Sequence, residues 1–557
     1  MDPVRTLPMD RFKLLDRLYQ AGIWTCLAVA LTLIFILATS YRVQAQWSTD
    51  PATPMVVCDA ANSQRNMGAI ADADSGYFVF WSDLRNNAQK ADLYGQHFDS
   101  EGNALWAANG TLLLSNPSRS INLTAPLLMP DGSVMVLYTT GSGSVGSDTI
   151  RAMRFDADAA ALWAEPPIVL GGLDYRSMKV VPSDSCAYVM AYCESCGGGG
   201  YGCRMQRVRM DGSVQFPLAG GVATGHYGPY TVHADGVGGI VHSIRCGNGA
   251  GTCLKAQRFD SLGTAVWPAY MDLADADGLN YAFSTAAEDG GGQLSVWEVN
   301  GDLRMNRIDA MGNTLWSPAV QVACDQPNGQ GTPDALVQDG ALYVTWCDNR
   351  AGAGGLYVQR YDLATGAEQW TADGVPAILE STYVPTSRLV PSDSGAVLAI
   401  MDMSGPHMYC AMRVRPDGTL AWDEAVSFAT ASGPFYEKRV ELPDGNGGVV
   451  AFWESLSGDL YGARVYRNGK LYDDVGVTEA GISTRVRAYP NPANERITFD
   501  LPVNERSIGI DVMDALGRIV GNYSAATTID IGALPNGGYT ARIRTSTFTH
   551  TIRFIKY

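Results

Sequence analysis

The stretch 77–106 reads YFVFWSDLRNNAQKADLYGQHFDSEGNALW, and the fold follows from the pattern it contains. An unbroken apolar run ends at Trp81 and is followed by a polar loop. A second strand pattern then leads into a turn at Gly102 and a Leu-Trp pair. The stretch 342–370 has the same order of features: an apolar run, a polar loop, a strand, a turn with Gly, and a Trp. Self-similar stretches of this kind indicate a repeat architecture.

The apolar runs recur at a nearly constant spacing. They end at 81, 138, 192, 242, 297, 346, 400 and 453. Asp-Gly turns precede several of the runs, and such turns join antiparallel strands because Gly accepts positive φ. Four short strands per unit, at a period of roughly 50 residues, predict an all-β fold. We expect an eight-bladed β-propeller over 46–480, with seven blades as the alternative. A string of β-sandwich domains would need units of about 100 residues.

Composition and charge exclude two broad classes of protein. The chain has 557 residues, of which 46% are hydrophobic and 17% are charged, so it is not a disordered chain. Its formal net charge is −17, from 40 basic and 57 acidic residues. A chain this acidic does not present the basic surface that nucleic-acid binding requires, so we expect no nucleic-acid partner.

The N-terminal segment has the three parts of a signal peptide. Basic residues at 5, 11, 13 and 17 precede an apolar run over 23–38, and Val43-Gln44-Ala45 is a small-residue cleavage pattern. We therefore predict a signal peptide over 1–45. Because the apolar run is only slightly shorter than the roughly 20 residues of a membrane span, an uncleaved anchor is the alternative.

The cysteines are consistent with export to an oxidising compartment. Without Cys26, ten of the 11 cysteines remain, and two pairs with equal spacing flank Gly-rich stretches. We predict that each pair forms a disulfide across a hairpin: Cys196 with Cys203, and Cys246 with Cys253. The connectivity of the other six cysteines stays open. Zinc binding at Cys193 and Cys196 is the alternative, but no His stands at ligand spacing.

Acid–base pairs follow two of the apolar runs. Asp83 and Arg85 follow the first run, and Asp348 and Arg350 follow the sixth. The simpler interpretation is an ion pair that pins each loop. If the loops converge on one face of the ring, the same four residues would form a polar ligand face. We expect no cofactor, and calcium at Asp275 and Asp277 is a weaker hypothesis because their spacing departs from that of an EF-hand loop.

A separate module begins near residue 486, after a linker at 481–485. The last 72 residues carry eight basic and six acidic side chains, so the acidic excess of the body ends here. Five short alternating strand patterns with Gly turns predict a small Ig-like β-sandwich over 486–557.

The motifs of this module stand in a recognisable order. They are Tyr489-Pro490-Asn491-Pro492, the run 514–520 with Gly517, the run 534–539 with Gly538 and Tyr539, and a terminal Phe-Ile-Lys that ends at Lys556. The segment resembles the type A C-terminal sorting domain of the Bacteroidota type IX (Por) secretion system.

That resemblance implies a route out of the cell. Proteins of this family cross to the periplasm by a signal peptide, and an outer-membrane translocon then recognises the tail. The cargo is either released, or a sortase-like enzyme removes the tail and attaches the protein to the cell surface. The resemblance therefore implies a secreted or surface-displayed protein, with the translocon and the sortase-like enzyme as partners.

Two further resemblances bear on enzymatic activity. The turn 362–370 is similar to the tryptophan-docking motif of quinoprotein dehydrogenases, but those enzymes carry adjacent cysteines and this chain has no Cys-Cys pair. The same turns faintly resemble the Asp-boxes of sialidases, from which their spacing departs. No catalytic motif is readable. We predict a module that binds a polysaccharide or a surface protein. A glycan-degrading hydrolase or lyase and a structural surface component are the alternatives.

Overall fold

The computed structural model describes most of the chain after residue 46. The described ranges are 47–141, 148–173, 175–184, 186–193, 202–217, 221–224, 230–246, 253–275, 279–288, 290–350, 354–379, 386–395, 397–403, 408–430, 438–472, 487–490, 493–501, 507–514, 518–524, 526–545 and 549–557. The predicted signal peptide, 1–45, lies outside them. No helix in these ranges is long and apolar enough to cross a membrane. The chain divides into two compact units, and the boundary in the sequence falls between Asp473 and Asp474.

The N-terminal unit is built from antiparallel four-stranded sheets, and eight of them lie in the described residues. The first sheet contains β2 (Gln64–Ala71), β3 (Tyr77–Asp83), β4 (Asp92–Phe98) and β5 (Thr111–Leu114), and the second contains β6 (Ser120–Leu128), β7 (Val134–Gly141), β8 (Asp148–Phe155) and β9 (Ile168–Leu173). The third sheet contains β10 (Tyr175–Ser183), β11 (Cys186–Cys193), β12 (Gly202–Arg209) and β13 (Gly221–Thr224), and the fourth contains β14 (Tyr230–Ala234), β15 (Ile240–Cys246), β16 (Cys253–Phe259) and β17 (Met271–Asp275).

The other four sheets have the same order of strands, except that the last one is completed from the start of the chain. They are β18 (Leu279–Glu288), β19 (Gly292–Val299), β20 (Asp302–Ile308) and β21 (Val320–Cys324); β22 (Gln330–Gln338), β23 (Ala341–Asp348), β24 (Gly355–Asp362) and β25 (Val375–Leu379); β26 (Thr386–Pro391), β27 (Val397–Met403), β28 (Met408–Val414) and β29 (Val426–Thr430), with the short helix η1 (Asp393–Gly395); β30 (Arg439–Pro443), β31 (Val449–Glu454), β32 (Leu460–Val465) and β1 (Met55–Cys58).

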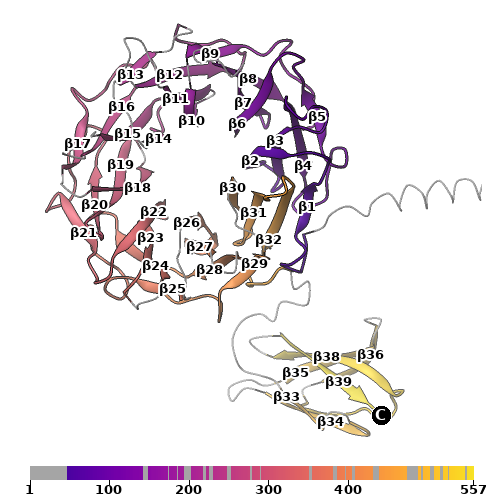
Figure 1. Cartoon of the computed structure of the whole chain (residues 1–557). Coiled ribbons are helices and arrows are strands. Elements are labelled where there is room, and N and C mark those ends of the chain that lie inside the picture. Colours follow the sequence, from indigo (N-terminus) through magenta and orange to yellow (C-terminus); the bar gives the residue numbers. More distant parts are fainter. Residues whose placement is uncertain are drawn as a thin grey trace, which may run out of the picture. The chain divides into compact units, whose positions relative to one another are not determined.

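The sheets follow one another around a ring (Figure 1). The first strand of each sheet contacts the first strand of the next, and β30 of the last sheet contacts β2 of the first. The N-terminal strand β1 pairs antiparallel with β32, so the two ends of the unit share one sheet. We call this unit the ring.

The apolar runs are unbroken because each sheet is covered on both faces. Along β3, Tyr77, Val79 and Trp81 belong to a core shared with the last sheet. The intervening Phe78 and Phe80 belong to a core shared with β6 and β7. Since successive side chains of a strand point to opposite faces, a strand buried on both faces has no polar positions to alternate with.

A tryptophan joins each sheet to the next at almost every junction. The indole Nε1 of Trp106, which follows the third strand of the first sheet, donates to the carbonyl of Ala157 in the second sheet at 2.8 Å. Trp47 donates to Ser100 at 2.9 Å and so links the last sheet to the first. The same contact recurs at Trp163, Trp267, Trp316, Trp370 and Trp422. At the remaining junction Phe216 lies over Gly263, without a polar contact from its ring.

The C-terminal unit has two antiparallel sheets around one core. One sheet contains β33 (Arg487–Tyr489), β34 (Arg496–Asp500) and β37 (Thr528–Asp530). The other contains β36 (Ile519–Ser524), β35 (Ser507–Met513), β38 (Gly537–Thr545) and β39 (Thr549–Lys556). Both sheets contribute to the core, with Phe499 from the first and Ile510 and Phe554 from the second. The all-β prediction is therefore confirmed for both units.

Candidate functional site

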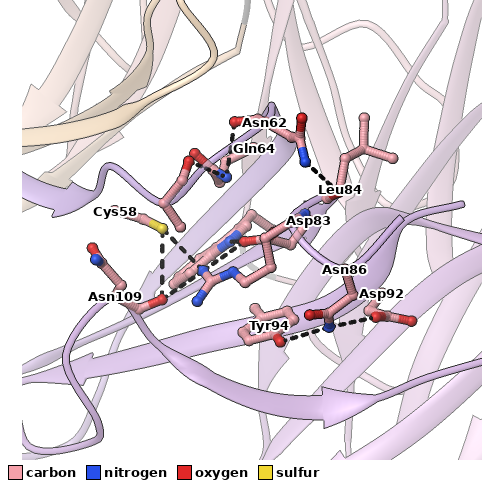
Figure 2. A network of polar contacts seen from close by, with 12 residues as sticks. Cys58, Asn62, Gln64, Asp83, Leu84, Asn86, Asp92, Tyr94 and Asn109 are labelled. Atoms are coloured by element: carbon pink, nitrogen blue, oxygen red, sulfur yellow. Dashed lines mark hydrogen bonds and ion pairs between the residues drawn. The ribbon is translucent and has the colours of Figure 1, made fainter. Parts of the chain in front are cut away.

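Asp83, the acid of the first predicted pair, ends β3 (Figure 2), and Arg85 follows it in the loop after that strand. The Asp83 side chain is fully buried, and its Oδ2 accepts from the indole of Trp81 at 2.7 Å and from the Arg85 guanidinium at 2.6 Å. Its Oδ1 accepts from the backbone N–H of Arg85 at 2.8 Å. Both carboxylate oxygens therefore have partners inside the protein.

The Arg85 guanidinium also contacts the neighbouring sheet. Its Nη2 donates to the carbonyl of Asn109 at 2.7 Å and to the Sγ of Cys58 on β1 at 3.1 Å. The guanidinium lies over the ring of Tyr94, 4.1 Å from the centroid. Burial raises the pKa of the Cys58 thiol to about 11, although Arg85 acts in the opposite direction. The thiol is therefore protonated at neutral pH.

The second predicted pair repeats this arrangement between the fifth and sixth sheets. Asp348 accepts from Trp346 at 2.8 Å and from Arg350 at 2.5 Å, and Arg350 donates to the Sγ of Cys324 at 3.2 Å. The Arg350 guanidinium lies 4.2 Å from the centroid of Tyr357. We call the two arrangements the junction clamps. They belong to different sheets, their acids are buried, and their geometry favours the loop-pinning interpretation over the ligand face.

The ring also has an open cavity that sequence reasoning missed. Its volume is about 610 Å³, and residues from the first strands of six consecutive sheets line it. We call it the axial cavity; its lining residues are Lys179, Tyr230, Thr231, Val232, His233, Ala282, Phe283, Ser284, Thr285, Thr332, Pro333, Asp334, Ser387, Arg388, Arg439 and Glu441.

Hydrogen bonds between strands fix much of the wall of this cavity. Asp334 on β22 accepts from the hydroxyl of Ser284 at 3.0 Å and from the backbone N–H of Leu389 at 2.9 Å. Thr285 contacts the Nε2 of His233 and donates to the hydroxyl of Thr231 at 2.7 Å. Burial lowers the pKa of His233 to about 4, so this imidazole is neutral at pH 7.

The cations of the axial cavity differ in how they are paired. Arg439 forms an ion pair with Glu441 at 2.7 Å. Lys179 on β10 and Arg388 on β26 are exposed, and their charged ends have no ion pair or hydrogen bond with any residue that the structure describes. Although Lys179 is accessible from the cavity, the surrounding protein partly desolvates its ammonium group and lowers its pKa, and the positive charge of Arg388 lowers it further. The cavity is therefore locally basic in a strongly acidic protein.

A fourth cation stands beside the cavity. The Nζ of Lys438 donates to the carbonyl of Thr124 at 3.3 Å. Burial lowers the pKa of Lys438, Glu454 partly offsets this effect, and Lys179 adds to it. Lys179 thus repels two cations, Arg388 on β26 and Lys438 just before β30.

One signal in the sequence could have pointed to the axial cations. Lys179 begins the run KVVPSDS and Arg388 begins the run RLVPSDS, each three residues before a Pro. Each residue also has the same register in its sheet, because Lys179 lies opposite Met190 and Arg388 lies opposite Ile400. Alignment of the units would therefore have shown two cations at one equivalent position.

The predicted disulfides and the predicted calcium site fall partly or wholly outside the described residues. Cys253 is disulfide-bonded, and the residue directly opposite it in the ladder is Cys246. Cys203 is buried on β12 and is not disulfide-bonded in the structure, which contradicts the predicted pairing with Cys196, a residue outside the described part. The calcium hypothesis falls on Asp277 and on the side chain of Asp275, both outside the described part. No cluster of metal-ligating side chains occurs in the described ranges.

In the C-terminal unit, two of the predicted motif residues are structural. Tyr539 is buried, stacks on Phe554 with centroids 5.6 Å apart, and donates its hydroxyl to the carbonyl of Pro535 at 2.7 Å. The Nζ of Lys556 donates to Asn494 at 3.2 Å. Gly538 lies in β38 opposite Ile555. Tyr489 is exposed at the end of β33, ahead of Pro490, whereas Asn491, Pro492 and Gly517 lie outside the described residues.

Comparison with protein families identifies this unit. Residues 487–557 match the model of the secretion system C-terminal sorting domain. The C-terminal unit is a type IX sorting domain. The chain is therefore type IX secretion cargo, exported to the cell surface or released, as the sequence motifs predicted.

The ring has no comparably informative relative. No curated protein matches the chain. Among solved structures it is similar to a puromycin-hydrolysing peptidase of Mycobacterium tuberculosis (14% identity, TM-score 0.39, 74% of this chain and 61% of that one). It is also similar to prolyl oligopeptidase B of Galerina marginata (11%, 0.39, 72% and 55%) and to an ulvan lyase of polysaccharide lyase family 25 (10%, 0.36, 78% and 96%). The chain thus covers less than two thirds of both peptidases, and scores this low carry no argument about activity.

Proposed function

We propose that the protein is an exported binding module: an eight-bladed β-propeller whose ligand site is the axial cavity, followed by a sorting domain. In this proposal 1–45 is a cleaved signal peptide, 46–480 is the propeller, 481–485 is a linker and 486–557 is the sorting domain. Antiparallel four-stranded sheets that contact one another in a ring support the propeller, because ring closure protects the sheet edges.

A single observation carries the binding role. The cavity of about 610 Å³ has walls fixed by hydrogen bonds between strands, and it presents the charged ends of Lys179 and Arg388 without protein partners in the described residues. Its size falls in the range that small ligands occupy, and a pre-formed site with a few placed polar groups is what such ligands require. We expect the ligand to be part of an extracellular polysaccharide or of a surface protein.

Binding is a better account of this cavity than glycan hydrolysis or lysis. The two carboxylates in the lining are already engaged, Asp334 by two donors and Glu441 by Arg439. A general acid and a general base both need access to the substrate, and neither carboxylate is left free for that role.

The binding role is tested by a thermal-shift screen of the purified protein against neutral and acidic polysaccharides, with a search for shortened products. A ligand that binds only the native state raises the melting temperature. A shift with intact glycan supports a binding module, and a shift with cleaved glycan identifies an enzyme. No shift with any glycan would direct the search to a protein partner or a structural role.

The export role has a separate test. Deletion of 486–557 should retain the protein in the periplasm, because the translocon would have no tail to recognise. Immunoblots of periplasm, outer membrane and medium would show this. Normal secretion of the truncated protein would contradict the role of the tail, and a mass spectrum of the wild-type product would show whether a sortase-like enzyme has removed it.

A further inference from the structure

The two unpaired cations of the axial cavity face each other across the ring. Lys179 lies on β10 of the third sheet and Arg388 on β26 of the seventh, and Figure 1 shows these strands on opposite sides of the ring's centre. They occupy the same position of their sheets, with the same register. The ring therefore directs one positive charge into the cavity from each side.

The positive charges of Lys179 and Arg388 lack an ion pair with a negative charge among the described residues. Like charges in a partly desolvated space repel, and the repulsion is relieved when an anion lies between them. The same wall contains Arg439, which does have its own carboxylate in Glu441. Lys179 and Arg388 have no such carboxylate among the described residues, although the chain has 57 acidic side chains.

The rest of the lining suits a ligand with hydroxyl groups. Tyr230 and Phe283 line the cavity together with Thr231, Ser284 and Thr332. The hydroxyls of Ser284 and Thr332 donate to Asp334 and to Cys347, so toward a ligand they can act only as acceptors. A net charge of −17 repels polyanions at long range, so an acidic ligand would have to be bound by local contacts.

We propose that the axial cavity binds an acidic saccharide, with Lys179 and Arg388 each contacting a carboxylate or sulfate oxygen. This inference rests on the proposed binding role of the cavity and specifies its ligand class. Guanidinium and ammonium groups form charge-assisted hydrogen bonds with such oxyanions, which are stronger than hydrogen bonds between neutral groups. The saccharide is either a free acidic oligosaccharide or the end of a longer chain.

Isothermal titration calorimetry of the purified protein provides the test. The probes are a galacturonate trimer, a glucuronate-containing disaccharide and a sulfated galactose disaccharide, each paired with its neutral counterpart: a methyl ester or a desulfated sugar. Polygalacturonate and inorganic sulfate complete the set. At least one acidic probe should bind at least tenfold more tightly than its neutral counterpart, and more tightly than sulfate alone. If the trimer binds more tightly than polygalacturonate, with the two compared at the same concentration of chain ends, the ligand is a free oligosaccharide.

Three variants assign the binding to the cavity. Arg388→Gln and Lys179→Gln should each weaken binding of the acidic probe about tenfold or more, and the double variant should abolish it. Arg209→Gln is the matched control, because Arg209 is an exposed cation at the end of β12 and does not line the cavity. It removes the same charge and should change affinity less than twofold. Thermal unfolding of each variant confirms that it is folded.

The failures can be told apart. Equal affinity for acidic and neutral probes, with loss of both on Ser284→Phe, would leave the binding role standing and overturn the acidic ligand. Unchanged affinity in the Lys179/Arg388 double variant would overturn the assignment to these residues. Binding of sulfate alone, with no gain from the sugar, would overturn the saccharide. No binding of any probe would overturn the inference together with its basis in a glycan ligand.

Discussion

The junction clamp at Arg85 and the axial cavity at Arg388 each contain an arginine of the ring, but the two side chains have opposite surroundings. Arg85 is held by a buried carboxylate, a carbonyl, a thiol and an aromatic ring. Arg388 is exposed in a cavity and has no such partners among the described residues. A charge whose partners are all internal stabilises the fold, whereas a charge without them remains available to a ligand.

The comparison also shows which charged residues can be recognised as a pair from the sequence alone. Asp83 and Arg85 are two residues apart and are conspicuous as a pair, yet they are an internal clamp. Lys179 and Arg388 belong to different units, and only the ring brings them to the same space. If the charges of the ring divide into internal clamps and cations available to a ligand, substitutions in the two groups should differ in their effect on stability.

Removing the buried acid of a junction clamp should have the largest effect. Asp83→Ala leaves a guanidinium and an indole N–H without their acceptor, so we expect the free energy of unfolding to fall by about 3–5 kcal/mol. Asp348→Ala should behave in the same way. Urea denaturation would measure both, with the exposed turn residue Asp417 mutated to Ala as the control. A loss below about 1 kcal/mol at Asp83 would show that the clamp does not hold the junction.

The wall of the axial cavity should lose stability in mild acid. His233 has a pKa of about 4 in the folded protein and about 6.5 when unfolded, so the unfolded state takes up the proton first. Its contribution is complete above pH 6.5 and is lost as the pH falls from 6.5 to 4, by at most about 3 kcal/mol. His233→Gln should flatten the stability profile in this window. A profile that the substitution leaves unchanged would contradict the burial of this imidazole.

The thiols of the junction clamps should be unreactive until the protein unfolds. Burial raises the pKa of Cys58 to about 11 and that of Cys324 to about 12, and reactive thiols need their thiolate form. At pH 8, native protein should therefore react with a maleimide at these residues only as fast as it unfolds, whereas protein in urea should react at once. Peptide mapping would identify the labelled residues. We expect Cys58→Ala to cost about 1–2 kcal/mol through lost packing.

The smallest effect on stability should come from the axial cations. Lys179→Gln removes a charge that is repelled by Arg388 and has no protein partner in the described residues, so the free energy of unfolding should stay within about 0.5 kcal/mol or rise slightly. Thermal and urea unfolding would both report it. A loss of 2 kcal/mol or more would assign Lys179 to the framework of the ring.

Local pattern predicted much of the fold. Apolar runs such as 77–81 could be identified because both faces of each sheet are covered, and the strand that contains this run is the second of its sheet. The sorting domain could be identified from its motifs because the family has a fixed order of residues. Buried positions such as Tyr539 and Lys556 explain part of that order, since the tail must keep its own small core.

The axial cavity could not be predicted from local pattern. Its lining comes from six strands that span β10 to β30, and each strand contributes only a few side chains. A single Lys179 carries no signal of its own, because its chemistry depends on the residue across the ring. The clamps misled for the opposite reason: an acid and a base near a strand end look alike in sequence whether they are buried or exposed.

The same substitution at two arginines tests the division between framework and site most directly. The measurement is the free energy of unfolding in urea, without ligand, for Arg85→Gln and Arg388→Gln. We predict a loss of at least about 2 kcal/mol at Arg85, because a buried carboxylate loses its partner, and a change within about 0.5 kcal/mol at Arg388. Equal losses at the two positions, or a larger loss at Arg388, would contradict the conclusion that one arginine holds the ring together and the other is kept for a ligand.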